Sequence, residues 1–239
     1  MIFAPYEDKL FYSITNRYGG VSPKPYDSLN LALHVKDDPK NVLENRVILA
    51  QKHDFILQNL IYMDQTHSSN IIVIKDSSQN KIENCDGLIT NIKNIPLMVM
   101  VADCIPILFY EPVKNVIAVA HAGRNGTFNE IAKKTIIKMI DEFNCSDSDI
   151  LVYFGASIHE CCHEIGQEIA KVADEKYVSV KDDRWYLDLH SMNFDQLLSV
   201  GVLENNIDIS KICTCCDKDY FSYRREGVTG RFAGIMKLK

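Results

Sequence analysis

The sequence has no long hydrophobic runs and no excess of basic residues. Lys and Arg number 26 against 32 Asp and Glu, which gives a formal charge of −6. A chain with this balance has no surplus positive charge to neutralise nucleic acid phosphates or an anionic membrane surface. No stretch approaches the roughly 20 apolar residues that span a bilayer. We therefore expect neither a nucleic acid nor a membrane partner.

The first ten residues also lack the apolar segment of a secretory signal, because polar and charged side chains occupy that region. A cytoplasmic location is therefore expected. In that compartment the eight cysteines are expected to be reduced thiols, with any special ones binding metal or acting as nucleophiles. We expect the partners of such a protein to be small-molecule substrates. We expect the protein itself to be a monomer or a small homo-oligomer.

Several common catalytic motifs are absent as well. The sequence has no P-loop, G-x-G-x-x-G, H-E-x-x-H or G-x-S-x-G pattern, which removes the usual fingerprints of nucleotide binding, zincins and hydrolases. No repeat, low-complexity tract or linker divides the 239 residues, and 46% of them are hydrophobic. We predict one domain over residues 1–239, large enough to bury a continuous core.

Apolar runs and periodicities predict an α+β fold of mixed β-sheets with flanking helices. The run Leu97-Met98-Val99-Met100-Val101 is too uniformly apolar for a wet face, so helices are expected to pack over the sheets. Asp38-Pro39 is typical of a helix start. Predicted strands cover residues 60–63, 70–74, 97–102, 105–110, 116–120, 150–154, 185–188, 209–214, 220–224 and 232–238. Predicted helices cover residues 39–53, 129–143, 164–177 and 190–200.

Three candidate metal ligands lie at or beside predicted strand ends: His67, Cys104 and His121. Two nitrogens and one sulfur suit Zn²⁺, and three protein ligands leave a fourth position for water or substrate. One thiolate leaves the ion a formal positive charge to polarise a substrate. Spacing alone, however, favours the ordinary interpretation, in which these are two core histidines and a buried cysteine satisfied by hydrogen bonds.

A second group of cysteines competes for a metal role. Read as C-C-H and C-x-C-C, the groups do not match the C-x₂-C pairs of zinc ribbons and fingers, so ordinary buried thiols are expected. Cys161 follows a turn-like segment after a strand and is a candidate reactive thiol. The residues concerned are Cys161, Cys162, His163, Cys213, Cys215 and Cys216.

At these residues the sequence resembles a bacterial family, the laccase-domain or polyphenol oxidase proteins. Its members are also described as purine nucleoside phosphorylases with adenosine deaminase activity and as peptidoglycan editing factors. The resemblance covers nearly the whole chain. It rests on TNRYGGVS (15–22), SLNL (28–31), NR (45–46), QTH (65–67), CDGL (85–88), ADC (102–104), HAG (121–123), CCHEIG (161–166), FSYRR (221–225) and TGR (229–231).

The resemblance implies that His67, Cys104 and His121 are the metal ligands and the catalytic site, with zinc or, in the laccase description, copper. It also implies an unusual α+β arrangement of mixed sheets. Among the residues in the shared blocks, Asn30, Arg46 and Arg225 are expected to bind substrate, with Arg46 holding the anion, since arginine offers a planar fork to phosphate.

Two segments depart from the family's usual pattern. The family continues His-Ala-Gly with Trp, a basic residue and Gly, whereas this chain has Arg124-Asn125-Gly126. Where the family has Gly-Pro-Ser-Ile-Gly-Pro, this chain reads GASIHE at residues 155–160. Contacts with the substrate beside His121 are the expected point of difference.

Four functions remain open from the sequence. The first is phosphorolysis of inosine, adenosine, guanosine or methylthioadenosine with attendant adenosine deamination at one zinc site. The second is hydrolysis of an amide in a peptidoglycan precursor, with Cys104 as nucleophile and His121 as base. The third is copper-dependent phenol oxidation, which the small number of histidines disfavours. The fourth is non-catalytic binding of a metal or a purine.

Overall fold

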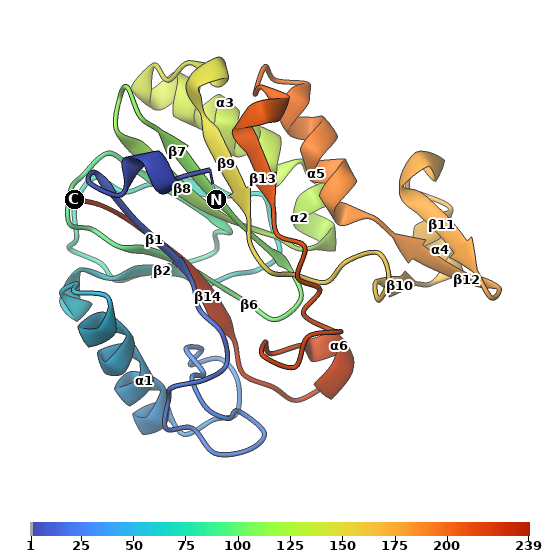
Figure 1. Cartoon of the computed structure of the whole chain (residues 1–239), viewed down its shortest axis with the longest axis horizontal. Helices are drawn as coiled ribbons and strands as arrows, with labels where there is room; N and C mark the ends of the chain where they lie inside the picture. Colours follow the sequence, from blue (N-terminus) through green and yellow to red (C-terminus); the bar gives the residue numbers. More distant parts are fainter. Residues whose placement is uncertain (1) are drawn as a thin grey trace.

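Two mixed sheets form the centre of the computed structural model, which describes residues 2–239 (Figure 1). The first sheet has the strand order β1-β14-β6-β2-β4. Its strands are β1 Leu10–Ile14, β14 Phe232–Leu238, β6 Leu97–Val101, β2 Ile61–Met63 and β4 Lys81–Ile82. Strands β1, β14 and β6 are antiparallel neighbours, while β2 runs parallel to both β6 and β4.

The second sheet has six strands in the order β13-β9-β7-β8-β5-β3. They are β13 Ile207–Ile209, β9 Leu151–Phe154, β7 Ile105–Glu111, β8 Val116–Ala122, β5 Gly87–Thr90 and β3 Ile71–Val73. A tight turn joins β7 to β8, which pair as an antiparallel hairpin. A smaller antiparallel sheet stands at one side of the molecule and consists of β10 Glu164–Ile165, β12 Arg184–Leu187 and β11 Val178–Lys181 (Figure 1).

Six α-helices accompany the sheets in the described part of the chain: α1 Pro39–Lys52, α2 Arg124–Phe128, α3 Ile131–Phe143, α4 Gln167–Ala170, α5 Leu189–Leu198 and α6 Tyr223–Glu226. Short 3₁₀ turns cover Ala4–Tyr6, Leu57–Asn59, Asp147–Asp149, Glu175–Tyr177 and Glu204–Asn206. The Asp38 side chain caps α1 by accepting a hydrogen bond from the Lys40 amide, 2.9 Å away. None of the helices within residues 2–239 is both long and apolar enough to cross a membrane.

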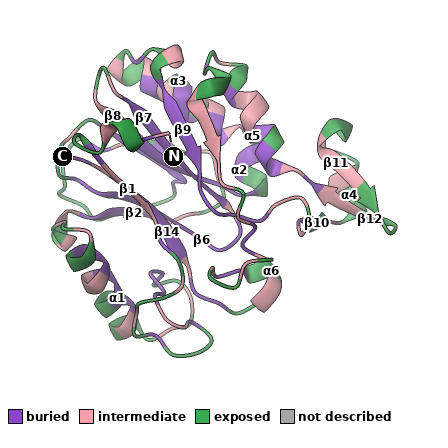
Figure 2. Ribbon diagram, viewed as in Figure 1, coloured by how far each residue is buried: buried purple, intermediate pink, exposed green. Residues whose placement is uncertain are grey.

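The elements stack in four layers, helix, sheet, sheet and helix. Strand β6 contributes side chains to two of the cores between these layers, because successive side chains of a strand point to opposite faces. Leu97, Val99 and Val101 lie in the core between the sheets, whereas Met98 and Met100 pack in the core that contains Leu49 and other residues under α1. Helices α3 and α5 cover the outer face of the second sheet, and purple, buried residues fill the centre of Figure 2. The predicted α+β class with mixed sheets and flanking helices is confirmed.

Two predicted elements are wrong, and the strand predicted at residues 209–214 lies instead at Ile207–Ile209. Residues 164–177 do not form one helix, because Glu164 and Ile165 pair with β12, and only α4 and one 3₁₀ turn follow. Residues 220–224 are not a strand, because the Ser222 side chain caps the start of α6 by accepting from the Arg225 amide. The sequence patterns do not predict strands β1, β4, β5 and β11. Strands β1, β4 and β5 pair with strands from other parts of the chain, which local pattern does not reveal, whereas β11 pairs with β12 across a two-residue turn.

Candidate metal centre and pocket

Connections that cross from one central sheet to the other bring the candidate ligands together. His67 follows β2 of the first sheet and precedes β3 of the second, and Cys104 lies between β6 and β7. His121 projects from β8, opposite Pro106 of β7. One ligand atom of each of the three residues lies within 4.8 Å of the other two. The structure thus places His67, Cys104 and His121 in one cluster.

The buried carboxylate of Asp86 holds this cluster in place through hydrogen bonds. It is fully buried and accepts hydrogen bonds from the amides of His67 (3.1 Å) and Ser68 (2.7 Å), and from the Thr66 amide (3.1 Å). It also lies 2.8 Å from Nδ1 of His121. Because Asp86 occupies Nδ1, the other ring nitrogen of His121, Nε2, is left for a ligand, the arrangement that orients histidines in metal sites.

The backbone beside two of the ligands is in the left-handed region. His67 has φ = 59° and Asp103, which precedes Cys104, has φ = 92°. Non-glycine residues avoid this region unless their surroundings hold them there, and such residues cluster at functional sites. The Asp103 carboxylate accepts from the Thr214 hydroxyl (2.8 Å) and from the Arg224 amide (2.6 Å), which fixes the turn that presents Cys104.

Charge interactions within the cluster favour a thiolate beside charged imidazole. Burial raises the pKa of the Cys104 thiol, but His121 and His67 lower it more, to about 6. Burial lowers the pKa of His121, but the charge of Cys104 and the hydrogen bond that His121 donates to Asp86 raise it to about 9. Burial likewise raises the pKa of the Asp86 carboxyl, yet the hydrogen bonds of His121 and Ser68 hold it well below its usual range.

A glycine leaves the space that the sulfur needs. A Cβ atom added at Gly123, the N-cap of α2, would lie 2.8 Å from Sγ of Cys104 and 3.2 Å from Cδ2 of His67. Both contacts are shorter than side chains tolerate without moving. The Gly that follows His121-Ala122 therefore serves the ligand geometry.

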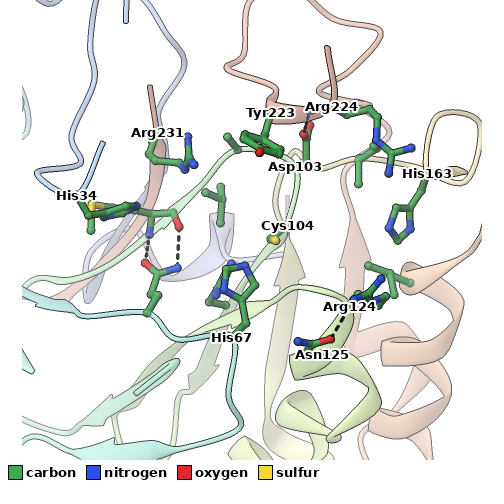
Figure 3. Close-up of a pocket in the computed structure, with 17 residues that line it drawn as sticks. His34, His67, Asp103, Cys104, Arg124, Asn125, His163, Tyr223, Arg224 and Arg231 are labelled. Atoms are coloured by element: carbon green, nitrogen blue, oxygen red, sulfur yellow. Dashed lines mark hydrogen bonds between the residues drawn. The ribbon is translucent and has the colours of Figure 1, made fainter. Parts of the chain in front are cut away.

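These three side chains line a pocket of about 550 Å³, and Figure 3 labels two of them, His67 and Cys104. His67 is exposed, Cys104 half-buried and His121 buried, so one side of the cluster faces the pocket. Apolar walls come from Met100, Ile158 and Leu189 among others. The polar lining consists of His34, Gln65, Asp103, Arg124, Asn125, His163, Tyr223, Arg224 and Arg231.

Three arginines give the pocket its positive charge, and they differ in how far their donors are used. Arg224 donates to the carbonyl oxygens of Cys162 (3.0 Å) and Glu164 (2.9 Å). The two Nη1 bonds of Arg231 go to the carbonyls of Thr229 and Gly230. Arg124 is exposed and bonds weakly to the adjacent Asn125 side chain, at 3.5 Å. No carboxylate of residues 2–239 forms a salt bridge with any of these three arginines.

The donor set fits a catalytic metal site. Two imidazoles and one thiolate suit borderline-soft ions such as zinc, and three protein ligands leave one direction open to the pocket. Asp86 supplies the partner that metal-bound histidine normally has on its second nitrogen. The structure thus offers a candidate site for a metal ion at His67, Cys104 and His121.

Asn30, Arg46 and Arg225, expected from the sequence to bind substrate, are not among the residues that line the pocket. Asn30 is fully buried and pairs with Ala32 and with the Asp37 carboxylate. The same residue accepts from the backbone amide of Arg231, 2.9 Å away, and so shapes the wall only indirectly.

The two arginines are also occupied elsewhere. The guanidinium of Arg46 donates to the Leu31 carbonyl at 2.8 and 3.0 Å and lies 4.1 Å from the centre of the Tyr62 ring. Arg225 donates to carbonyl oxygens of the turn before α6, among them those of Cys215 and Asp217. Their contacts support the fold around the pocket, and the arginines that line it are Arg124, Arg224 and Arg231.

The sequence analysis assigns no site role to Asp86, Tyr223 and His34. Asp86 and Tyr223 each lie in a block shared with the family, and that membership is the signal that points to them. His34 had no comparable signal, because the loop before α1 reaches the pocket only through tertiary folding. Both segments that depart from the family pattern contribute to the lining, through Arg124 and Asn125 and through Ile158.

Comparison with known proteins places this arrangement in a family. The family described as "Multi-copper polyphenol oxidoreductase laccase" matches residues 11–239. The chain belongs to this family. A relative from Corynebacterium glutamicum, named a purine nucleoside phosphorylase, is 39% identical over 94% of this chain and 92% of its own. Another from Bacillus subtilis, named purine nucleoside phosphorylase YlmD, is 31% identical over 94% of this chain and 87% of its own.

Solved structures of the family share the fold. The crystal structure of YlmD from Geobacillus stearothermophilus is 30% identical and superposes with a TM-score of 0.92 over all of this chain and 93% of its own. The YfiH structure from Bacillus licheniformis, titled a hypothetical protein, has the same identity and TM-score and covers 96% of this chain and 93% of its own. The resemblance seen in the sequence is therefore confirmed.

Proposed function

We propose that this protein is a metal-dependent purine nucleoside phosphorylase with adenosine deaminase activity at the same site. The observation that carries the proposal is the open cluster of His67, Cys104 and His121 in a pocket lined by three arginines that form no salt bridge within residues 2–239. Relatives across the family bear the phosphorylase name. When bound, zinc would supply Lewis acidity for an oxygen of the reactants.

Phosphate is the substrate that the arginines suit. A guanidinium offers parallel donors that match phosphate oxygens in two bonds. Arg124 is exposed and has only one weak side-chain contact, so it is free to turn toward an anion. Arg231 is held against the wall by backbone carbonyls and supplies fixed positive charge. We assign phosphate to the space between these two arginines and the triad.

The nucleoside would lie along the apolar and aromatic side of the pocket. Tyr223 is exposed at the rim and offers a ring face on which a purine can stack. Met100, Ile158 and Leu189 give the base and sugar an apolar surface, which accommodates inosine, adenosine, guanosine or methylthioadenosine. Asp86 and His121 keep the triad oriented while the purine leaves.

An assay of hypoxanthine release from inosine and phosphate tests this function. Zinc-loaded wild-type protein should release hypoxanthine, and release should depend on phosphate. Arg124→Gln should raise the KM for phosphate about tenfold or more, because a charge-assisted bond contributes about 1.5–3 kcal/mol. Arg184→Gln is the matched control, since Arg184 is exposed on the small sheet and pairs with Glu164. If metal-loaded protein with phosphate releases no hypoxanthine, the proposal is wrong.

A second candidate, an amide hydrolase with a thiol nucleophile, is favoured by one observation. Asp86, His121 and Cys104 follow one another as carboxylate, imidazole and thiol, the order found in nucleophilic triads. A thiol nucleophile requires no metal. Chelation distinguishes the two, because the phosphorylase should lose activity without zinc, whereas a thiol hydrolase should keep or gain it.

Copper-dependent phenol oxidation receives less support from the site. Histidine and cysteine side chains of residues 2–239 gather at two places, and the second contains no histidine. A multicopper enzyme needs several centres rich in imidazole ligands. Zinc is therefore the metal we assign to the triad, and metal analysis of native protein tests that assignment against copper.

A further inference from the structure

A second cluster of sulfur atoms lies beside the pocket and takes no part in the proposed reaction. The sulfur atoms of Cys161, Cys162, Cys213 and Cys216 all lie within 4.8 Å of one another. Three of the separations are 3.3 Å (Cys162 to Cys216), 3.9 Å (Cys161 to Cys162) and 3.9 Å (Cys161 to Cys216). Cys215 is not a member of this four-cysteine cluster.

We propose that Cys161, Cys162, Cys213 and Cys216 bind a second zinc ion in a closed, structural site. Zinc–sulfur bonds of about 2.3 Å in a tetrahedron place the sulfurs about 3.8 Å apart, close to the separations seen here. All four cysteines are free thiols in the structure. Binding Zn²⁺ would release the thiol protons to solvent and leave four thiolates on the ion. With four protein ligands, no position remains for a substrate.

Backbone hydrogen bonds bring together the two distant segments that contain the four cysteines. Ser157 and Cys213 form a parallel bridge, with the Thr214 amide donating to the Ser157 carbonyl at 3.0 Å. The Cys213 carbonyl accepts from the amide of Cys216 at 3.1 Å, which closes a tight turn. Cys213 and Cys216 therefore form a C-x₂-C pair, the spacing of zinc ribbons, which an interpretation as C-x-C-C overlooks.

Two arginines hold the same segments and offset the charge of a four-thiolate zinc site. Arg224 donates to the Cys162 carbonyl at 3.0 Å, and Arg225 donates to the Cys215 carbonyl at 3.0 Å. A zinc ion with four thiolates carries a formal charge of about −2, and nearby guanidinium groups reduce its cost. These contacts also give a role to Arg225, which lies away from the pocket.

Zinc bound by the four-cysteine cluster would help to hold one wall of the pocket in place. His163 follows Cys162 directly, and Tyr223 and Arg224 begin α6 shortly after Cys216. In Figure 1 the loop before β10 passes close to the segment that leads into α6. An ion bound by both segments would fix these pocket residues relative to one another. Its role is structural support, separate from the reaction at the triad.

Zinc content of native protein tests the proposal without relying on enzyme activity. Wild type and the control Cys215→Ser should each hold about two zinc ions per chain. The double variant Cys161→Ser/Cys216→Ser should hold about one, and so should Cys104→Ala, which removes a triad ligand instead. If the double variant keeps the wild-type zinc content, or wild type holds a single ion that Cys104→Ala abolishes, the proposal is overturned.

Spectroscopy and thiol chemistry cover the case in which the double variant does not fold. Wild-type protein refilled with Co²⁺ should show strong sulfur-to-cobalt charge-transfer absorption that survives in Cys104→Ala. The cluster thiols should react with a thiol reagent only after a chelator is added. Rapid reaction without chelator, a disulfide among these cysteines in native protein, or iron in place of zinc would each refute the zinc site. Because the readout is metal content, failure here leaves the phosphorylase proposal untouched, and the reverse also holds.

Discussion

Replacing Asp86 with asparagine should disable the triad while keeping its shape. The carboxylate oxygen Oδ2 receives the donors of Thr66 and Ser68, and Oδ1 receives those of His67 and His121. An asparagine has one oxygen for all of these donors. If its oxygen takes the side with more donors, its NH₂ group faces the His67 amide and Nδ1 of His121.

The size of the effect follows from that conflict. The NH₂ group can be satisfied only if Nδ1 of His121 becomes an acceptor, which moves the ring proton to Nε2, the nitrogen left for the metal. The amide of His67 loses its acceptor inside the protein. We expect zinc affinity at the triad to fall roughly 10–100-fold, as when other partners of ligating histidines are removed. Stability should fall by about 1–3 kcal/mol.

Competition with a chelator of known affinity measures the first effect, and urea unfolding measures the second. Glu226→Gln is the matched control, since Glu226 is a half-buried carboxylate that pairs with Arg17 and Arg225 away from the pocket. It should lower stability without changing zinc affinity at the triad. Wild-type zinc affinity and activity in Asp86→Asn would refute this account of the site.

Three further predictions concern other parts of the structure. Gly123→Ala should weaken zinc binding by displacing the sulfur of Cys104, while the circular dichroism spectrum stays unchanged. Zinc affinity equal to that of the wild type in a chelator competition would refute this role of the glycine. Asn45→Leu should cost about 2–4 kcal/mol in urea unfolding, because the buried amide links the 20–30 loop to α1 through several hydrogen bonds. Burial lowers the pKa of His190 to about 3, so the unfolded chain binds the extra proton between about pH 6.5 and pH 3 and stability falls as pH drops through that window. Between pH 7 and pH 4, His190→Gln should remove about 3 kcal/mol of that acid sensitivity, and identical stability profiles over this range would contradict it.

Local pattern was informative where an element is defined by its own residues. The helix at Pro39–Lys52 has its cap and proline in the sequence, and the apolar run Leu97–Val101 is buried on both faces as expected. The clustering of His67 and His121 was not visible in their spacing, because it depends on how two sheets stack. The family blocks supplied what spacing could not.

The assignment of substrate contacts had no such local basis. Arg46 in the sequence looks like any arginine near a site, but its guanidinium lies over an aromatic ring and binds a backbone carbonyl. Arg231 looks equally ordinary and lines the pocket. Which arginine meets solvent is decided by long-range packing, so one sequence does not separate the two roles.

The chain segments that connect the two central sheets affect how variants of the candidate ligands should be interpreted. His67 and Cys104 each lie where the chain leaves one central sheet for the other, and His121 projects from the second. A metal ion bound by these side chains would link the two central sheets to each other. Its binding free energy would then contribute to the stability of the fold as well as to catalysis. Loss of a ligand side chain should therefore weaken the packing of the two sheets against each other. The activity of such a variant would reflect both this loss of stability and the loss of metal chemistry.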